Sequence, residues 1–189
     1  TLEIFGQSRV EQRWEELLVH FLDSTNPHGF DTDVLRAFLR ALYSHGDTSM
    51  SGPLRNLEHV KVSSQVSTGN GIADILLRQP DEWFVCIELK VDAPETNAQT
   101  DRYAEAARLG DLDTRQHSGT NEYVYIAPTE APASVSEDFV DISWEHIVTE
   151  LETVLTDGFG KYPSKSSAQL ADFIDTIQLE LNMGDINQI

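Results

Sequence analysis

The 189-residue sequence lacks several features that define whole classes of protein. It has a single cysteine, Cys86, so no disulfide can form within the chain, and a reducing compartment is expected. No apolar run approaches the roughly 18 residues that identify a membrane-spanning helix, and no signal peptide is visible. We therefore expect a cytoplasmic protein that has no membrane partner.

Positive charge is also scarce. Lys and Arg together number 13 against 32 Asp and Glu, which gives a formal net charge of −19. This balance is unusual for a protein that binds nucleic acid, because phosphate contacts normally draw on a basic surface. Three interpretations stay open: an acidic shell like that of proteins adapted to high salt, a protein that binds no nucleic acid, and a mimic whose acids imitate DNA phosphates.

The sequence also lacks the motifs of several common enzyme classes. Six histidines are scattered without an H-x-x-x-H pair, so a zinc site is not expected, and no G-x-S-x-G nucleophile motif is present. Hydrophobic residues make up 40% of the chain, which is enough for a folded core at this length. We expect residues 1–189 to form one domain.

The hydrophobic pattern predicts an α/β protein. Helical and strand periodicities alternate along the chain, and the strands fall in the middle with helices before, between and after them. This order predicts a mixed central sheet of four to five strands that is flanked by helices on both faces. Strands are expected over residues 60–66, 72–78, 83–91, 121–127 and 139–142, and helices over 8–22, 31–44, 95–109 and two segments from Ser143 onward.

The predicted hairpin over residues 71–90 carries the most informative residues. Side chains alternate between the faces of a strand, so Glu88 and Lys90 share one face. If the turn is centred on Asp81, Asp74 falls opposite Glu88. Directly opposed like charges destabilise a sheet, and two carboxylates about 5 Å apart repel by roughly 3 kcal/mol at an effective dielectric of about 20. A cation between the two carboxylates would remove this repulsion.

Such a patch suits a divalent metal ion and a phosphate ester. Mg²⁺ prefers oxygen ligands and is typically held by one or two carboxylates together with substrate phosphate. The metal can activate water, and Lys90 can orient that water or stabilise developing negative charge. The reaction implied is hydrolysis of a phosphodiester. The alternative is a surface strand with an ordinary exposed Glu–Lys ion pair.

Three residues outside the hairpin are further candidates. Glu11 lies in the apolar stripe of the first predicted helix, where an acid is expected either to be functional or to be favoured by the helix dipole. Gln99 and Tyr103 are four residues apart and share one face of the helix predicted after Lys90. Either side chain can meet a metal-bound water or a phosphate, and a plain surface role is the alternative for both.

These residues resemble the PD-(D/E)XK nuclease superfamily. That family has an αβββαβ core with an acid on the second strand and (D/E)-x-K on the third, which look like Asp74 and Glu88-Leu89-Lys90. Its first-helix Glu resembles Glu11, and its Q-x-x-x-Y pattern resembles Gln99 to Tyr103. A branch of uncharacterised, defence-associated nuclease-like proteins is similar over most of the chain. The similar segments are FLDS at 21–24, HG at 28–29, GIADI at 71–75, IELK at 87–90 and ISWEHI at 142–147.

The resemblance implies a restriction-endonuclease-like fold and a Mg²⁺- or Mn²⁺-dependent deoxyribonuclease. The implied metal ligands are Asp74, Glu88 and the Leu89 carbonyl. DNA is the expected partner, RNA is a second candidate, and a homodimer is left open. The implied catalytic set is Asp74, Glu88, Lys90, Glu11, Gln99 and Tyr103.

The chain departs from the pattern of this branch at three places. Ser24 replaces a Pro, Ile72-Ala73 replaces Arg-Ile, and the first strand has only Ser64 or Gln65 where many members carry an acid. The last change leaves the one-metal set intact and argues against a second metal. It also motivates an alternative function, in which a catalytically inactive nuclease fold binds nucleic acid or a protein partner.

Overall fold

The computed structural model describes residues 8–46 and 56–186, and it describes side chains up to residue 181. Five strands form one mixed sheet in the order β1-β2-β3-β6-β7, which confirms the predicted fold class. The elements are α1 (Arg9–Leu22), α2 (Asp33–His45), a short 3₁₀ helix (Leu57–His59), β1 (Lys61–Ser67), β2 (Ile72–Gln79), β3 (Trp83–Leu89), α3 (Gln99–Ala104), β4 (Arg108–Leu109), β5 (Leu112–Asp113), β6 (Thr120–Ala127), β7 (Phe139–Ser143), α4 (Trp144–Asp157) and α5 (Ser164–Ile186).

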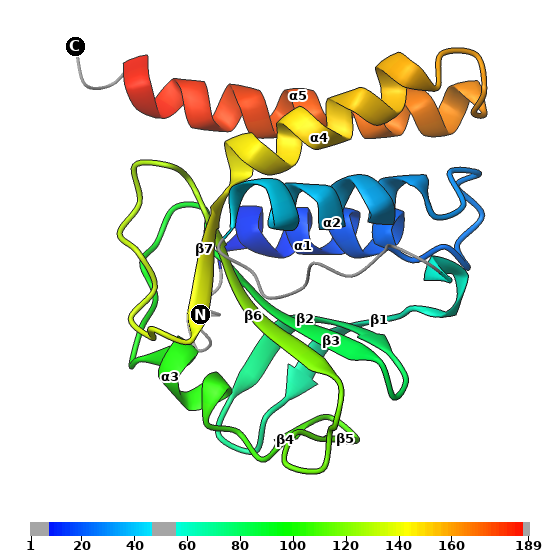
Figure 1. Cartoon of the computed structure of the whole chain (residues 1–189). Helices are drawn as coiled ribbons and strands as arrows, with labels where there is room; N and C mark the ends of the chain where they lie inside the picture. The colour runs from blue at the N-terminus through cyan, green and yellow to red at the C-terminus, as the bar shows by residue number, and fades with distance from the viewer. Residues whose placement is uncertain (1–7, 47–55, 187–189) are drawn as a thin grey trace.

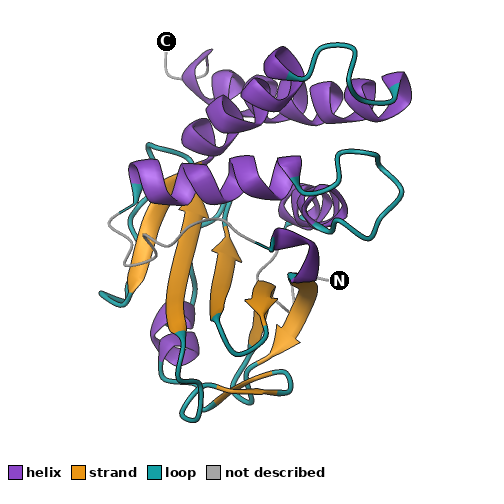
Figure 2. Cartoon of the chain, turned by 45° about the vertical axis from the view of Figure 1, so that its right-hand side comes forward, coloured by secondary structure: helices purple, strands orange, loops and turns teal. Residues whose placement is uncertain are grey.

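Helices cover the two faces of the sheet unequally. α1 and α2 pack on one face, and α4 and α5 form a further layer outside them (Figure 1). α3 and the small β4–β5 hairpin lie on the other side, as the second view also shows (Figure 2). Each face therefore has its own hydrophobic core, and the central strand β3 contributes to both.

The β2–β3 hairpin forms as its sequence predicts. Gln79 pairs with Trp83, which leaves residues 80–82 as the turn, with Asp81 at its centre in a left-handed conformation (φ 64°). The N–H of Glu82 donates to the carbonyl of Gln79 at 3.1 Å and closes the turn. This turn fixes the register of the two strands that carry the candidate residues.

The direction of strand pairing changes at β3. β1, β2 and β3 pair antiparallel, whereas β3 runs parallel to β6 and β6 runs parallel to β7. The parallel register runs from Trp83 beside Thr120 to Leu89 beside Ile126. β3 is thus held on both edges, and its carboxyl end lies where the helix layer and the sheet meet (Figure 1).

The helix predicted over residues 95–109 is wrong in its extent, because α3 spans only Gln99–Ala104. Asn97 and Ala98 have positive φ values of 54° and 47°, so the chain cannot be helical before Gln99. After Ala104 the chain enters the β4–β5 hairpin, whose tight turn contains Gly110 at φ 60°. The apolar residues of this segment therefore pack on the sheet from a hairpin and not from a longer helix.

The start of the β3–β6 pairing provides a test of the fold. Gly119 precedes β6 and Glu82 precedes β3, and a Cβ at Gly119 would collide with the carbonyl oxygen of Glu82. Because backbone must move, we expect Gly119→Ala to lower the free energy of unfolding by about 1–3 kcal/mol in urea titrations. Ser63→Ala, an exposed change on β1 that adds no Cβ, is the control. A Gly119→Ala variant as stable as wild type would contradict this close approach.

Candidate active site

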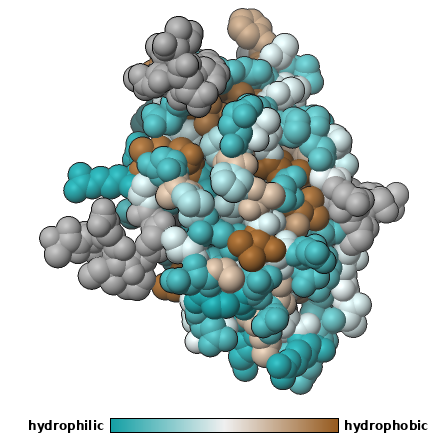
Figure 3. Space-filling view, turned by 90° about the vertical axis from the view of Figure 1, so that its left-hand side faces the viewer, coloured by the Kyte–Doolittle hydropathy of each residue, from teal (hydrophilic) through white to brown (hydrophobic). Residues whose placement is uncertain are grey.

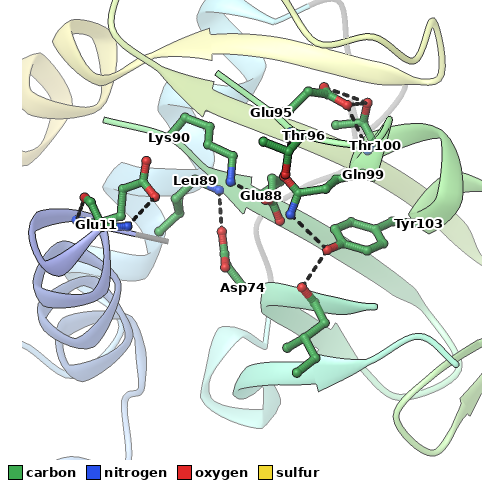
Figure 4. A network of polar contacts seen from close by, with 12 residues as sticks. Glu11, Asp74, Glu88, Leu89, Lys90, Glu95, Thr96, Gln99, Thr100 and Tyr103 are labelled. Carbon is green, nitrogen blue, oxygen red and sulfur yellow. Dashed lines mark hydrogen bonds and ion pairs between the residues drawn. The ribbon is translucent and has the colours of Figure 1, made fainter. Parts of the chain in front are cut away.

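The predicted site residues meet at the carboxyl end of β3. Glu11 comes from the first turn of α1, Asp74 from β2, and Glu88 and Lys90 from β3 and the residue after it (Figure 4). Their exposed fractions are small: 0% for Glu11, 6% for Asp74, 1% for Glu88 and 3% for Lys90. These four ionisable side chains are therefore largely removed from water.

The hairpin register brings the two strand carboxylates together. Ile75 lies opposite Ile87, so the next pair along the same register is Asp74 and Glu88. The Oδ2 atom of Asp74 accepts the backbone N–H of Leu89 at 2.7 Å. The Asp74 side chain therefore reaches the end of β3 and accepts a backbone hydrogen bond that would otherwise go to the backbone of a neighbouring strand.

Glu88 and Lys90 form a buried ion pair. The Nζ atom of Lys90 lies 2.7 Å from Oε1 of Glu88, and the side chains are 4% and 1% exposed. The interpretation of this pair as an exposed surface contact is therefore wrong. The other oxygen, Oε2 of Glu88, is buried, and no N–H or hydroxyl group of the described residues donates to it. A protonated Asp74 can donate a hydrogen bond to the Glu88 carboxylate, and this bond lowers the pKa of Glu88. Once Asp74 loses its proton, the oxygen has no donor and is available to a ligand.

The Glu11 carboxylate accepts hydrogen bonds from two separate parts of the chain. Its N–H donates to Oγ of Ser8 at 3.1 Å while its Oε2 accepts the N–H of Ser8 at 3.2 Å, which makes a capping box at the start of α1. Its Oε1 accepts the N–H of Val91 at 3.0 Å. The carboxylate therefore ties the first turn of α1 to the chain that leaves β3.

Gln99 and Tyr103 lie beside this group on α3 (Figure 4). They are 8% and 2% exposed, so the surface role considered for both is wrong. The Nε2 of Gln99 donates to the hydroxyl of Tyr103 at 3.3 Å, and that hydroxyl donates to the carbonyl of Ile72 at 2.7 Å. These bonds hold α3 against the start of β2, close to Asp74.

Burial dominates the electrostatics of the site. It raises the pKa of Asp74 well above the ordinary value, and the negative charge of Glu88 raises it further. Burial also raises the pKa of Glu88, although Lys90 partly opposes this change. Burial alone would lower the pKa of Lys90, but the charge of Glu88 and its hydrogen bond outweigh it and raise the pKa to about 12. The lysine is therefore charged at neutral pH, and the carboxyls hold protons more tightly than usual.

The structure adds a second acid of α1 that the sequence reasoning missed. Glu15 is 3% exposed and accepts bonds from Nε2 of Gln65 at 3.0 and 2.8 Å. Gln65 has φ 52° and, in the β1–β2 register, stands opposite Asp74. The charge of Glu15 also raises the pKa of Asp74. The four-residue spacing of Glu11 and Glu15 on one helix face was the available signal.

The loops beside the site are joined by a second network that the sequence did not indicate. The Glu95 carboxylate accepts the N–H of Thr100 at 3.3 Å, its hydroxyl at 3.0 and 2.9 Å, and the N–H of Val135 at 2.9 Å. The hydroxyl of Thr100 in turn accepts the N–H of Ser136 at 3.0 Å. This network fixes the start of α3, which carries Gln99, against the loop between β6 and β7.

Comparison with known protein families agrees with the geometry. A family model described as the PD-(D/E)XK nuclease superfamily matches residues 1–181. The chain therefore belongs to this superfamily, which confirms the resemblance seen in its motifs and indicates a nuclease. Comparisons with curated proteins and with solved structures find no significant match.

Two kinds of feature are absent from the part of the chain that the structure describes. Within residues 8–46 and 56–186, no helix is long and apolar enough to cross a membrane. In the same part of the chain, no group of three or more His, Cys, Asp or Glu side chains is arranged to hold a metal ion. The expected metal set has only two such side chains, Asp74 and Glu88, and adds a backbone carbonyl.

The raised pKa values predict how stability depends on pH. Asp74 binds its proton more tightly in the folded protein than in the unfolded chain, so its contribution to stability is present at acidic pH. That contribution is lost as pH rises through the raised pKa. We expect the free energy of unfolding, measured in urea with EDTA, to fall between acidic and neutral pH. Asp74→Asn should flatten this dependence, whereas the control Asp175→Asn, an exposed change on α5, should leave it unchanged. Equal slopes in all three proteins would contradict the buried-acid picture.

Proposed function

We propose that this protein is a nuclease that uses a divalent metal ion to hydrolyse phosphodiester bonds of DNA. The observation that carries the proposal is the pair of buried carboxyl groups of Asp74 and Glu88: no N–H or hydroxyl of the described residues donates to Oε2 of Glu88, and besides Lys90 it is a protonated Asp74 that hydrogen-bonds to the Glu88 carboxylate. Membership of the PD-(D/E)XK nuclease superfamily supports the reaction class.

The donor set fits Mg²⁺ or Mn²⁺. Both ions take oxygen ligands, and Asp74 and Glu88 provide carboxylates that otherwise repel each other. The N–H and C=O of one residue point to the same edge of a strand, and the N–H of Leu89 donates to Asp74. The Leu89 carbonyl is therefore directed to the β2 edge and can serve as the third protein ligand. When bound, the ion supplies Lewis acidity and an activated water.

The remaining residues have supporting tasks in this proposal. Lys90 is charged and is held at 2.7 Å from Glu88, so it can position the water or stabilise charge that develops on the phosphate. Glu11 holds the chain at Val91, and Gln99 and Tyr103 fix α3 beside the carboxylates. Asp74 and Glu88 must both release their protons before they can bind the ion.

The acidic surface is the main obstacle to a nucleic-acid substrate. A bound divalent ion would oppose it locally. The exposed Arg9 and Arg13 each lie two residues from the buried Glu11, so they project from the other side of α1 and do not face the carboxylates. The basic side chain that the site itself provides is Lys90. The face shown in Figure 3 is largely hydrophilic with separate hydrophobic areas.

A second candidate function has its own support. Gln65 stands opposite Asp74 on β1, where many members of the superfamily carry an acid, and its amide is bound to Glu15. With that acid replaced, the site holds fewer metal ligands. The alternative is therefore a nuclease fold that binds nucleic acid or a protein partner without cutting it.

Metal binding should be visible as a gain in stability. A ligand that binds only the folded state at a hundred times its Kd stabilises by about 2.7 kcal/mol, which for a chain of this size raises Tm by roughly 5–10 °C. We expect Mn²⁺ to produce such a shift in wild type and in Glu16→Gln, an exposed control on α1. Glu88→Gln should abolish the shift. A full shift in Glu88→Gln would place the ion elsewhere and overturn the assigned ligands.

Cleavage separates the two candidate functions. With Mg²⁺ or Mn²⁺ we expect nicking of plasmid DNA, and Lys90→Met should lower the rate by roughly 100-fold or more, since one stabilising donor at developing charge has that effect. Lys61→Met, an exposed change on β1, is the matched control. The same proteins are assayed on RNA. Metal binding without cleavage of either polymer would establish the inactive alternative.

A further inference from the structure

The ladder between β3 and β6 ends at a residue that cannot continue it. The N–H of Lys90 donates to the carbonyl of Ile126 at 2.8 Å. In a parallel ladder, the carbonyl of the same residue accepts from the residue two positions further along the partner strand. That residue is Pro128, which has no N–H. The buried Lys90 therefore has a carbonyl that β6 cannot satisfy.

A tryptophan side chain takes the place of the missing donor. The indole Nε1–H of Trp144 donates to the carbonyl of Lys90 at 2.9 Å, and the side chain is 0% exposed. Trp144 is the first residue of α4 and follows directly after β7. The Oγ of Ser143 accepts the N–H of His146 at 3.2 Å and fixes this first turn.

The hydrogen bond acts on a peptide group that also binds Glu11. The carbonyl of Lys90 and the N–H of Val91 belong to one planar peptide unit. Trp144 holds the carbonyl end at 2.9 Å, and Glu11 holds the N–H end at 3.0 Å. Rotation of this plane would break both bonds and change the direction in which the chain leaves Lys90.

The same tryptophan also contacts the helix that carries Glu11. Its ring packs edge-on against Trp14, with ring centroids 5.0 Å apart and an interplanar angle of 84°. Trp14 lies three residues after Glu11 on α1, so both point toward the same part of the molecule. The indole pair thus connects α1, the end of β3 and α4.

We propose that Trp144 is a positioning residue of the site. Through its indole N–H it fixes the peptide after Lys90 and so sets the direction of the Lys90 side chain and the contact of Val91 with Glu11. The catalytic consequence rests on the proposed nuclease function, whereas the positioning itself does not. A role in core packing alone would require the ring but not its N–H.

The kinetic test removes the donor and keeps an aromatic ring. We expect Trp144→Phe to lower kcat roughly 10- to 100-fold, because small displacements of catalytic groups have effects of this size. KM should stay within about twofold of wild type, since binding of the ground state is unaffected. Trp14→Phe is the matched control, because it changes the other ring of the pair and leaves the Trp144 donor in place. A kcat in Trp144→Phe equal to that of Trp14→Phe would reduce Trp144 to a packing residue and overturn the proposal.

A rescue variant tests the hydrogen bond itself. Pro128→Ala introduces a backbone N–H at the position from which the ladder would reach the Lys90 carbonyl. In Trp144→Phe, the second change Pro128→Ala should raise kcat again by about fivefold or more. For a loss of roughly 30-fold, in the middle of the range expected for Trp144→Phe, this is half of the loss on a logarithmic scale. A double variant no more active than Trp144→Phe would refute the assignment to this bond.

An NMR measurement tests the proposal without any nuclease activity. In ¹⁵N-labelled wild type, the Trp144 indole N–H should exchange with solvent at least about tenfold more slowly than a free indole, because it is buried and bonded. In Trp144→Phe, the Val91 amide should exchange about tenfold faster, and in Trp14→Phe it should not. Fast exchange of the wild-type indole would overturn the proposal even if Trp144→Phe does not fold. In a protein that cuts no nucleic acid, a protected indole together with faster Val91 exchange in Trp144→Phe alone would sustain the positioning role while the nuclease function fails.

Discussion

The site depends on how the central strand ends. Within three residues, the backbone of β3 runs out of partners on both edges, and side chains take over. Asp74 accepts the N–H of Leu89, Trp144 donates to the carbonyl of Lys90, and Glu11 accepts the N–H of Val91. A buried backbone group without a partner costs about 1–3 kcal/mol. The carboxylates at the end of β3 are therefore held there by the folding of the strand itself, before any ligand is considered.

This arrangement explains why such strongly charged residues are buried. Asp74 and Glu11 each direct an oxygen to a backbone donor, and Glu88 directs one oxygen to Lys90. Burial nevertheless raises the pKa of Asp74 and Glu88, so full ionisation of the group is unfavourable in the absence of a further cation. Folding thus pre-organises a set of acids that a hard cation would stabilise, and binding of such an ion is coupled to loss of protons.

Local features were predictable from the sequence. The turn at Asp81 and the alternation of side chains gave the register of the hairpin, because both depend on residues close together in the chain. The motifs taken together, which are Glu11, Asp74, Glu88-Leu89-Lys90 and Gln99 to Tyr103, were sufficient to recognise the superfamily. The extent of α3 was not predictable, because a positive φ is common for Asn97 but rare for Ala98, and nothing in the local sequence signals it there.

Long-range contacts were also beyond the sequence. Trp144 is 54 residues from Lys90, and its helical stripe predicts only a core position. The burial of the Glu88–Lys90 pair depends on helices from both ends of the chain, so the motif alone could not exclude an exposed ion pair. The pairing of Gln65 with Glu15 spans 50 residues and depends on a positive φ in β1. In each case the missing information is which distant segment covers a locally ordinary residue.

The replacement of an acid by Gln65 bears on how many ions the site would hold. Glu11, Glu15, Asp74 and Glu88 are all buried near a single buried lysine. If all four acids were ionised, one divalent ion together with Lys90 would leave one negative charge on the group, and two ions would leave one positive charge. The amide of Gln65 adds no charge and instead donates to Glu15, which stabilises that carboxylate without a metal. Charge alone therefore does not decide between one ion and two. The difference lies in the ligands, because an uncharged amide that is already bound to Glu15 is a poorer ligand for a second ion than a carboxylate would be.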